Sequence, residues 1–566
     1  MSRARLGPWL LAAAVAAFLG VFLLWPLGHV FVRAFRDPQG FTTLYMRGLF
    51  SSPTQLEAII TSLWIATLVS LTCLVIALPL AWLFARRDFP GKPLAAGLLL
   101  IPMILPPFVS AVGIKMIFAR VGALSTLLLN CNIVDGPVDW LGRWPLLGIV
   151  LLEALHLFPV LYLNLVAALA NIDPSLEEAA ANQGAAPLRV FRRITLPLAA
   201  PGLFAGLVLT FIWSFTELGT PLVFGLRRVL PVMIYDRISE IGSNPSGYAQ
   251  VTFVLVLSAL GFWIGKRLTR QGRDVATLGR GSVGRREPRL SRGGALLAWL
   301  FLGGVLALAV LPHLSVVLLA VTRRWFLTVL PDGWTLEFFH RALTSELTRT
   351  ALLNSLGLSI AATLMDLAAG FAIAWVCVRS RLRIGDGLDA LAMLPLAVPG
   401  LVLAFGYLGA FGSAFRGSAL FDPRVNPLLL LAISYAVRRL PFMVRAAHAG
   451  LEQVSPVYEE AAANLGATPF RVVRRITLPL VSANLLAGGI LCFAFSMLEV
   501  SDSLILAQAE PFYPITKAIY AVMDSLENGL NVAAALGVWA MALLAAALLW
   551  TAALLGKRMG QMFRAG

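Results

Sequence analysis

The chain has 566 residues, of which 59% are hydrophobic and only 13% are charged, and its formal net charge is +16. This composition excludes an ordinary soluble globular protein, because a soluble core does not need apolar runs of about 20 residues again and again. The positive charge lies mostly in the loops between the runs, so anionic lipid headgroups are its expected partner and nucleic acid is not.

Apolar runs long enough to cross a bilayer recur along the chain, since a helix rises about 1.5 Å per residue. His156 and Arg438 interrupt two of these runs. The sequence predicts an all-α integral membrane protein with about twelve transmembrane helices, at residues 8–32, 58–84, 95–119, 145–169, 199–223, 248–265, 294–320, 350–377, 387–411, 427–450, 481–506 and 531–556.

The first run is longer than the apolar core of a usual signal peptide, so we expect an uncleaved span. Lys and Arg are concentrated in the loops that lie inside when the N-terminus is cytoplasmic, which predicts that both termini face the cytoplasm. None of the four cysteines has a disulfide or metal-ligand spacing, and we expect no metal site.

One polar passage occurs twice. The stretch EEAAANQGAAPLRVFRRITLPL at residues 177–198 returns at residues 459–480 with 18 of its 22 positions identical. Matching residues upstream predict two homologous halves of six spans each, at residues 1–265 and 294–566. Six is an even number, so the halves are parallel repeats that enter and leave the membrane on the same side.

A basic segment, residues 266–293, joins the two halves. It carries no apolar periodicity and is typical of a flexible cytoplasmic linker. We expect it to act as a tether at an anionic membrane surface rather than as a specific site.

Each copy of the repeated passage belongs to a predicted cytoplasmic hairpin, at residues 171–198 and 453–480. Asp173 and Ser455, each followed by proline, are good N-cap residues for a short helix. Gly184 and Gly466 permit a left-handed turn before a second short helix begins. The predicted structure is a small helix–turn–helix that lies on the membrane face, with an alanine-rich side that another protein can approach.

The pattern E-A-A, three residues, G, nine residues, I-x-L-P resembles the cytoplasmic coupling loop of ABC importer permeases. The resemblance implies the type I ABC importer permease fold, a bacterial inner-membrane location and one ATPase subunit docked on each loop, hence two copies. It assigns ATPase coupling to Glu177, Glu178, Ala179, Ala180, Gly184, Ile194, Leu196, Pro197, Glu459, Glu460, Ala461, Ala462, Gly466, Ile476, Leu478 and Pro479.

The fusion of both halves in one chain is similar to the ferric-iron permeases and their relatives, as are the motifs SFTELGTPLVFG and RRLPFMVRAA. This likeness implies ferric iron as the solute, while a phosphorylated organic solute, thiamine or a polyamine stays open. The sequence has no phosphate-binding loop, so we expect ATP and Mg²⁺ to bind partner subunits and no cofactor to bind this chain. The short outer loops imply a separate solute-binding protein.

Charged residues within spans are costly and often face a cavity. Glu217 and Glu499 are equivalent in the two halves, and they either line a path for a cation or are held by a helix end or near the outer interface. The second group of candidates for the path comprises Asp502, His156, Arg438 and Arg439. The two arginines either bind solute oxygens or neutralise nearby acids such as Asp502. The sequence therefore leaves the sign of the solute's charge open.

Two other classes of protein compete with the importer. A secondary transporter also has twelve spans in parallel halves, but it needs no hairpin for an ATPase. A membrane enzyme requires a reactive constellation of side chains, and the sequence shows none.

Overall fold

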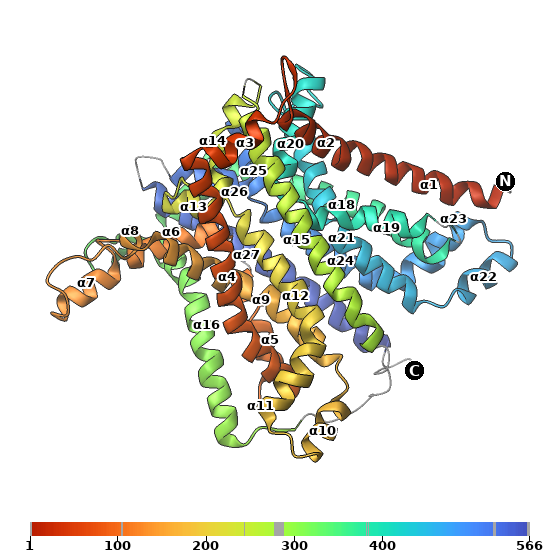
Figure 1. Ribbon diagram of the computed structural model, residues 1–566, viewed down its shortest axis with the longest axis horizontal. Coiled ribbons are helices and arrows are strands. Elements are labelled where there is room, and N and C mark those ends of the chain that lie inside the picture. The colour runs from red at the N-terminus through yellow and green to blue at the C-terminus, as the bar shows by residue number, and fades with distance from the viewer. Residues whose placement is uncertain are drawn as a thin grey trace. The chain divides into compact units, whose positions relative to one another are not determined.

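The computed structural model describes residues 3–103, 106–242, 244–276, 288–380, 382, 384–523 and 528–562. The chain divides into two compact units: unit 1 comprises residues 1–49, 234–255 and 339–566, and unit 2 comprises residues 50–233 and 256–338. Helices make up most of the ribbon in Figure 1. Each unit also has one short antiparallel hairpin, β1–β2 in unit 1 and β3–β4 in unit 2.

The elements of unit 1 follow the chain in this order: α1 (Arg3–Leu19), the π-helix η1 (Gly20–Leu24), α2 (Trp25–Ala34), β1 (Arg36–Asp37), β2 (Gly40–Phe41), α3 (Leu44–Ser51), η4 (Ile238–Glu240), the first part of α15 (Ser246–Ala276), α17 (Glu337–Thr344), α18 (Glu346–Arg379), α19 (Gly385–Met393), η6 (Leu394–Ala397), α20 (Gly400–Ala414), α21 (Leu428–Gln453), α22 (Val457–Asn464), α23 (Pro469–Val472), η7 (Val473–Thr477), α24 (Leu478–Met497), α25 (Ser501–Leu506), η8 (Glu510–Phe512), α26 (Ile515–Met523) and α27 (Gly529–Met562).

The elements of unit 2 are α4 (Pro53–Arg86), α5 (Lys92–Leu98), η2 (Ile101–Met103), α6 (Pro107–Phe118), α7 (Ala123–Asn130), α8 (Trp140–Arg143), α9 (Pro145–Ala170), α10 (Pro174–Asn182), α11 (Pro187–Val190), η3 (Phe191–Thr195), α12 (Leu196–Phe215), α13 (Gly219–Phe224), most of α14 (Leu230–Asp236), the second part of α15, α16 (Arg292–Ala320), β3 (Thr322–Arg324) and β4 (Asp332–Trp334).

The predicted all-α membrane fold is confirmed. Within the described residues, 10 helices are long and apolar enough to cross a membrane, and the bent pair α19–α20 is an eleventh candidate. The predicted span 427–450 is also a helix, α21, but its arginines at 438, 439 and 445 place it outside that apolar set.

The third span of each half is not one continuous helix, and the predicted spans 95–119 and 387–411 were wrong in this respect. In the second half the chain bends by 100° between α19–η6 and α20. In the first half α5 and η2 end at Met103, and α6 starts at Pro107. Prolines explain both breaks, because Pro106 and Pro399 lack an N–H and restrict the residue before them.

The fifth spans are shorter than predicted. The spans 199–223 and 481–506 were drawn through the ends of α12 and α24, which stop at Phe215 and Met497. A short non-helical link follows each end, and then a short helix, α13 or α25, resumes. The two carboxylates predicted to lie within these spans, Glu217 and Glu499, therefore lie in the links.

Equivalent helices form the centre of each unit. In unit 2, α4, α9 and α12 pack against one another, and in unit 1 their counterparts α18, α21 and α24 do the same. Small residues allow the close approach that holds helices together in a membrane. A Cβ atom at Gly206 of α12 would lie 2.6 Å from Leu161 of α9, and one at Gly488 of α24 would lie 2.7 Å from Ala446 of α21.

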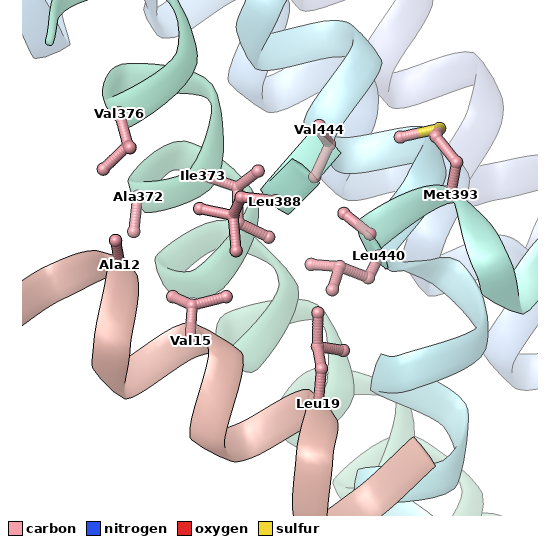
Figure 2. Close-up of a cluster of buried hydrophobic side chains, with 11 residues drawn as sticks. Ala12, Val15, Leu19, Ala372, Ile373, Val376, Leu388, Met393, Leu440 and Val444 are labelled. Atoms are coloured by element: carbon pink, nitrogen blue, oxygen red, sulfur yellow. The ribbon is translucent and has the colours of Figure 1, made fainter. Parts of the chain in front are cut away.

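The first helix of the chain packs against helices of the second half. Figure 2 shows Ala12, Val15 and Leu19 of α1 pointing towards side chains of α18, α19 and α21. One turn further on, the hydroxyl of Tyr407 donates a hydrogen bond of 2.6 Å to the carbonyl oxygen of Phe22. In a bilayer such contacts stabilise through packing and hydrogen bonding, since lipid tails are as apolar as the side chains.

The first helix of the second half makes the reciprocal arrangement in unit 2. Helix α16 packs against α6, α9 and η2 of the first half. A Cβ atom at Gly113 of α6 would collide with Ser315 and Val316 of α16, so glycine is required for this contact. The compact units thus do not coincide with the predicted halves at residues 1–265 and 294–566, because each unit contains the first helix of the other half. The predicted halves describe the repeat in the sequence.

The structure describes both ends of the predicted linker, residues 266–293. Helix α15 continues to Ala276, beyond the predicted end of the sixth span. Residues 288–290 pair with the loop after α4: the N–H of Asp88 donates to Pro288, the N–H of Leu290 donates to Asp88, and Arg289 forms an ion pair with Asp88 at 3.2 Å. The middle of the linker, 277–287, lies outside the described residues.

We expect the chain to assemble when it is cut after Arg280, because α1 and α16 each pack on helices of the other half and do not need the covalent tether. Co-expressed fragments 1–280 and 281–566, with a tag on one of them, should purify together from detergent. Fragments that also lack both exchanged helices, starting at residues 44 and 321, serve as the control and should separate. Fragments 1–280 and 281–566 that insert into the membrane but do not co-purify would contradict the role given to these helices.

Candidate functional site

The first repeated passage folds as the predicted helix–turn–helix (Figure 1). Asp173 caps α10, since its carboxylate accepts a hydrogen bond of 2.9 Å from the N–H of Ser175. The same hydrogen bond lowers the pKa of Asp173 below its ordinary value. Gly184 has a φ of +81° and turns the chain towards α11, which begins at Pro187. We call residues 171–198 hairpin 1.

The second passage, hairpin 2 (residues 453–480), has the same order of elements, α22, α23 and η7. Gly466 has a φ of +84°, which confirms the second left-handed turn. The start of α22 differs slightly from the prediction: Pro456 is the cap residue, and Ser455 accepts only a long bond of 3.4 Å from the N–H of Val457.

The two glutamates of each passage lie in different surroundings. Glu177 and Glu459 are half-buried against the chain itself. Arg86 and Thr195 donate to Glu177 at 3.0 and 2.6 Å. Glu178 and Glu460, one residue further on, are exposed. Only the second glutamate of each pair therefore faces outwards from the hairpin.

Apolar side chains are exposed on both hairpins. Leu188 is 68% exposed in hairpin 1, and its counterpart Phe470 is 74% exposed in hairpin 2. Leu465, next to the turn of hairpin 2, is 90% exposed. Large apolar groups that are left uncovered outside the membrane spans are typical of a surface for another protein.

The remaining predicted coupling residues have matching places in the two copies. Ala179 and Ala461 are exposed on the first short helix, whereas Ala180 and Ala462 are half-buried. The other members lie where each hairpin joins its fifth span, with the isoleucine and leucine half-buried and the proline exposed: Ile194, Leu196, Pro197, Ile476, Leu478 and Pro479.

In unit 1 the predicted path residues form one buried network of charges. Glu499 forms an ion pair with Arg438 at 2.6 Å and accepts a hydrogen bond from Arg439. Asp502 lies 3.4 Å from Arg438 and also accepts a bond of 2.8 Å from Ser434. The second predicted role of the arginines, neutralising nearby acids, is the one that this geometry matches.

Glu217 and Glu499 both accept bonds from the start of the short helix that follows them. The carboxylate of Glu217 accepts from the N–H groups of Gly219 and Thr220 at 3.1 and 3.3 Å. Glu499 accepts from the N–H of Asp502 at 3.3 Å. The N–H groups at a helix start favour an anionic partner. Each glutamate therefore stabilises the short helix that follows the break in its span.

The polar residues of unit 2 differ from those of unit 1. His156, which matches Arg438 in the repeat, lies 2.8 Å from the carbonyl oxygen of Pro102 in the broken third span. Glu153 is 1% exposed, accepts a hydrogen bond from Ser214 and lies within electrostatic range of Glu217. The position that matches Arg439 is Leu157. The second-half arginines thus have no arginine counterpart here.

Sequence reasoning missed the arginines that bind the inward-facing glutamates. Arg86 and Arg379 end α4 and α18, and the loop charges around them were used only to orient the chain. A usable signal was present in the sequence, because Arg86 and Arg379 each end the second span of their half. The two arginines are 293 residues apart, whereas the two hairpins are 282 residues apart. Among the described residues, no group of three or more His, Cys, Asp or Glu side chains is placed to hold a metal ion.

Comparison with known proteins identifies the repeat. The family model for the binding-protein-dependent transport system inner membrane component matches the chain twice, at residues 77–273 and 366–561. A putative ferric transport system permease protein of Haemophilus influenzae is 27% identical over 86% of this chain and 76% of its own length.

Shorter relatives match about half of the chain. The molybdenum transport system permease protein of H. influenzae is 33% identical over 40% of this chain and 99% of its own length. A putative 2-aminoethylphosphonate transport system permease protein of Salmonella choleraesuis is 28% identical over 47% of this chain and 93% of its own length. The chain therefore belongs to the family of inner membrane components of binding-protein-dependent transport systems, with the family domain present twice.

Proposed function

We propose that this chain forms the whole membrane pore of an ATP-driven importer for ferric iron. The family makes the chain a multi-pass inner-membrane permease that works with an ATPase and a solute-binding protein, and the chain itself is not an enzyme. The observation that carries the proposal is the doubled hairpin, with exposed apolar side chains at equivalent positions of both copies.

Two hairpins give two docking surfaces, and so two ATPase subunits. ATP and Mg²⁺ bind those subunits, because the present sequence contains no phosphate-binding loop. Both hairpins and both termini then face the cytoplasm, in agreement with the distribution of Lys and Arg. The solute-binding protein delivers its cargo on the opposite side.

The buried charges favour a cation over an oxyanion as the solute. In unit 1 the two arginines already have Glu499 and Asp502 as partners, so they leave no excess positive charge for an anion. In unit 2 Glu153 and Glu217 lie within range of each other, and the matching positions for the arginines hold His156 and Leu157. Carboxylate oxygens suit a hard cation such as Fe³⁺. The ferric permease relatives, which match most of the chain, support the same choice.

Reconstitution tests this function. The chain is purified with the ATPase and the binding protein encoded beside it and placed in liposomes that contain ATP. We expect uptake of radiolabelled ferric iron that depends on ATP and on the binding protein. Uptake of molybdate or 2-aminoethylphosphonate instead, with none of iron, would overturn the choice of solute and leave the importer mechanism in place.

Valine at both turn glycines, Gly184 and Gly466, should release the ATPase. A β-branched residue at positive φ costs about 1–3 kcal/mol, or roughly 5- to 150-fold in the population of the correct turn. Nothing lies within 4 Å of a Cβ atom at either position, so the effect comes from the backbone and not from a collision. We expect at least about a tenfold loss of ATPase co-purification.

Asparagine at the same two glycines is the matched control, because it tolerates the left-handed conformation. The Asn variant should retain most of the co-purified ATPase and most of the uptake. Equal ATPase recovery with the Val variant and the unchanged chain would show that the turns do not set the docking surface.

Glu217→Gln and Glu499→Gln should have different effects, although the residues are equivalent in the repeat. Glutamine keeps an oxygen that accepts from the following helix and removes the charge. At Glu217 we expect normal yield with reduced ferric uptake, because the negative charge that faces the cation is lost. At Glu499 the two arginines lose their shared carboxylate, and breaking such a buried pair costs about 3–5 kcal/mol.

Thermal stability in detergent and uptake in liposomes, measured on both variants, separate the two effects. The expected pattern is a lower melting temperature for Glu499→Gln and an unchanged one for Glu217→Gln. Full uptake by Glu217→Gln would show that its carboxylate only caps α13.

A further inference from the structure

An arginine at the end of the second span of each half binds the hairpin of that half. In unit 2, Arg86 is the last residue of α4 and donates to Glu177 of α10 at 3.0 Å. In unit 1, Arg379 is the last residue of α18, and its Nε donates to both carboxylate oxygens of Glu459 in α22, at 3.2 and 3.1 Å. The same type of ion pair is thus built twice.

A threonine completes each ion pair. Thr195 donates to Glu177 at 2.6 Å, and Thr477 donates to Glu459 at 2.9 Å. Each threonine is buried and is the last residue before the fifth span, α12 or α24. We call the arginine, glutamate and threonine together a clamp, since they join the end of the second span, the first helix of the hairpin and the start of the fifth span.

The clamp is not a by-product of the repeated passage. The glutamate and threonine repeat at an offset of 282 residues, whereas the arginine repeats at 293 and lies 91 residues before its glutamate in the first half and 80 in the second. The arginines lie outside the repeated passage, so the packing of the second span brings them to the hairpin. Their offset relates them as equivalent positions of the two homologous halves.

The ion pairs are largely removed from solvent. The side chains of Arg86 and Glu177 are 14% and 20% exposed, and those of Arg379 and Glu459 are 9% and 16% exposed. Exposed ion pairs contribute little because water screens them and the side chains lose freedom. A partly buried pair with additional hydrogen bonds is held in a defined geometry, as a mechanical link requires.

A cavity lies beside the first clamp. Its volume is about 910 Å³, and it is lined by Trp82 and Arg86 of α4, Glu177 of α10, Leu188 of α11 and Phe191 of η3, among others. The space between the end of α4 and hairpin 1 is thus not filled by side-chain packing. The ion pair of Arg86 with Glu177 lies in the wall of this cavity and joins α4 to hairpin 1 there.

We propose that Arg86 and Arg379 are positioning residues that transmit movement of the hairpins to the second span of each half. The inference rests on the proposed docking of the ATPase on the hairpins. The chain connects each hairpin directly to α9 and α12, or to α21 and α24, but reaches α4 and α18 only through tertiary contacts. The clamp extends the action of the ATPase to these second spans.

The second clamp joins more elements than the first. One terminal nitrogen of Arg379 also donates to the carbonyl oxygens of Leu451 and Val454, at 3.0 and 2.7 Å, where α21 ends. Arg86 makes no corresponding bond in the structure, and its Nε is buried without a hydrogen-bond partner. Loss of Arg379 should therefore reduce coupling more than loss of Arg86.

The experiment compares ATPase docking with uptake per ATP hydrolysed. The variants Arg86→Met and Arg379→Met are reconstituted with the ATPase and the binding protein, and radiolabelled ferric iron is the probe. We expect both to retain the ATPase through purification and to lose about tenfold or more in iron carried per ATP. Arg86→Lys, which keeps the charge near Glu177, should restore most of the coupling.

Two further variants separate coupling from folding. Arg86→Met combined with Glu177→Gln leaves no unpaired buried carboxylate, so it should fold normally and stay uncoupled. Arg87→Met is the matched control, because Arg87 lies over the ring of Trp82 and is outside the clamp; its uptake per ATP should equal that of the unchanged chain.

Normal uptake per ATP in the Arg86→Met and Arg379→Met variants would overturn the inference. Failure of the unchanged chain to retain any ATPase is a different result, since it would refute the proposed function and with it the basis of the clamp. Uptake of a solute other than iron leaves the inference intact, and that solute then replaces iron as the probe.

Discussion

The core of a bilayer holds no water, so every backbone group freed at a break in a span must find its partner within the protein. This constraint explains several of the polar residues in the spans. Glu217 and Glu499 accept from the short helices that follow their breaks. His156 binds the carbonyl oxygen of Pro102 at a proline break, and Arg439 donates to the carbonyl oxygen of Phe495 at 2.7 Å near the end of α24. These side chains keep broken spans in a single conformation.

The two halves meet this constraint with different charges. The second half uses a balanced network in which two arginines surround Glu499, whereas in the first half the positions that match these arginines hold His156 and Leu157. A symmetric solution suffices for structure, so the asymmetry requires another explanation. The proposed function supplies one: a cation passes along carboxylates of the first half, while those of the second half stabilise the fold.

Much of the architecture follows from the sequence because it depends on local chemistry. The caps, the glycine turns and the helix–turn–helix of both hairpins are set by residues within a few positions of one another, and these predictions are confirmed. Ser455 is the small exception, because it accepts only a long bond from the N–H of Val457 and Pro456 is the cap residue of α22. The helix breaks were also visible, as the proline pairs Pro102/Pro106 and Pro395/Pro399, but average hydropathy over a window does not register them.

Long-range packing could not be predicted in the same way. Ala12, Val15 and Leu19 are apolar and could equally face lipid, so nothing in the sequence shows that they pack on the second half. Arg86 is one of several basic residues at the ends of spans, and its partner Glu177 is 91 residues away. An ion pair at that separation depends on how α4, α9 and α12 pack, which no local pattern encodes.

The hairpins are therefore better regarded as parts of a three-helix group than as loops at the end of one span. Hairpin 1 is covalently joined to α9 and α12 and held to α4 by the clamp, and these three helices pack together in unit 2. Hairpin 2 has the same relation to α18, α21 and α24. Arg379 at the end of α18 binds Glu459 of this hairpin and also donates to carbonyl oxygens where α21 ends. In the proposed mechanism, a force applied to a hairpin moves this group of helices together, because packed helices shift between discrete arrangements instead of deforming smoothly. The proposal thus gives a mechanical reason for a partly buried ion pair at this position, where an exposed pair would suffice for solubility.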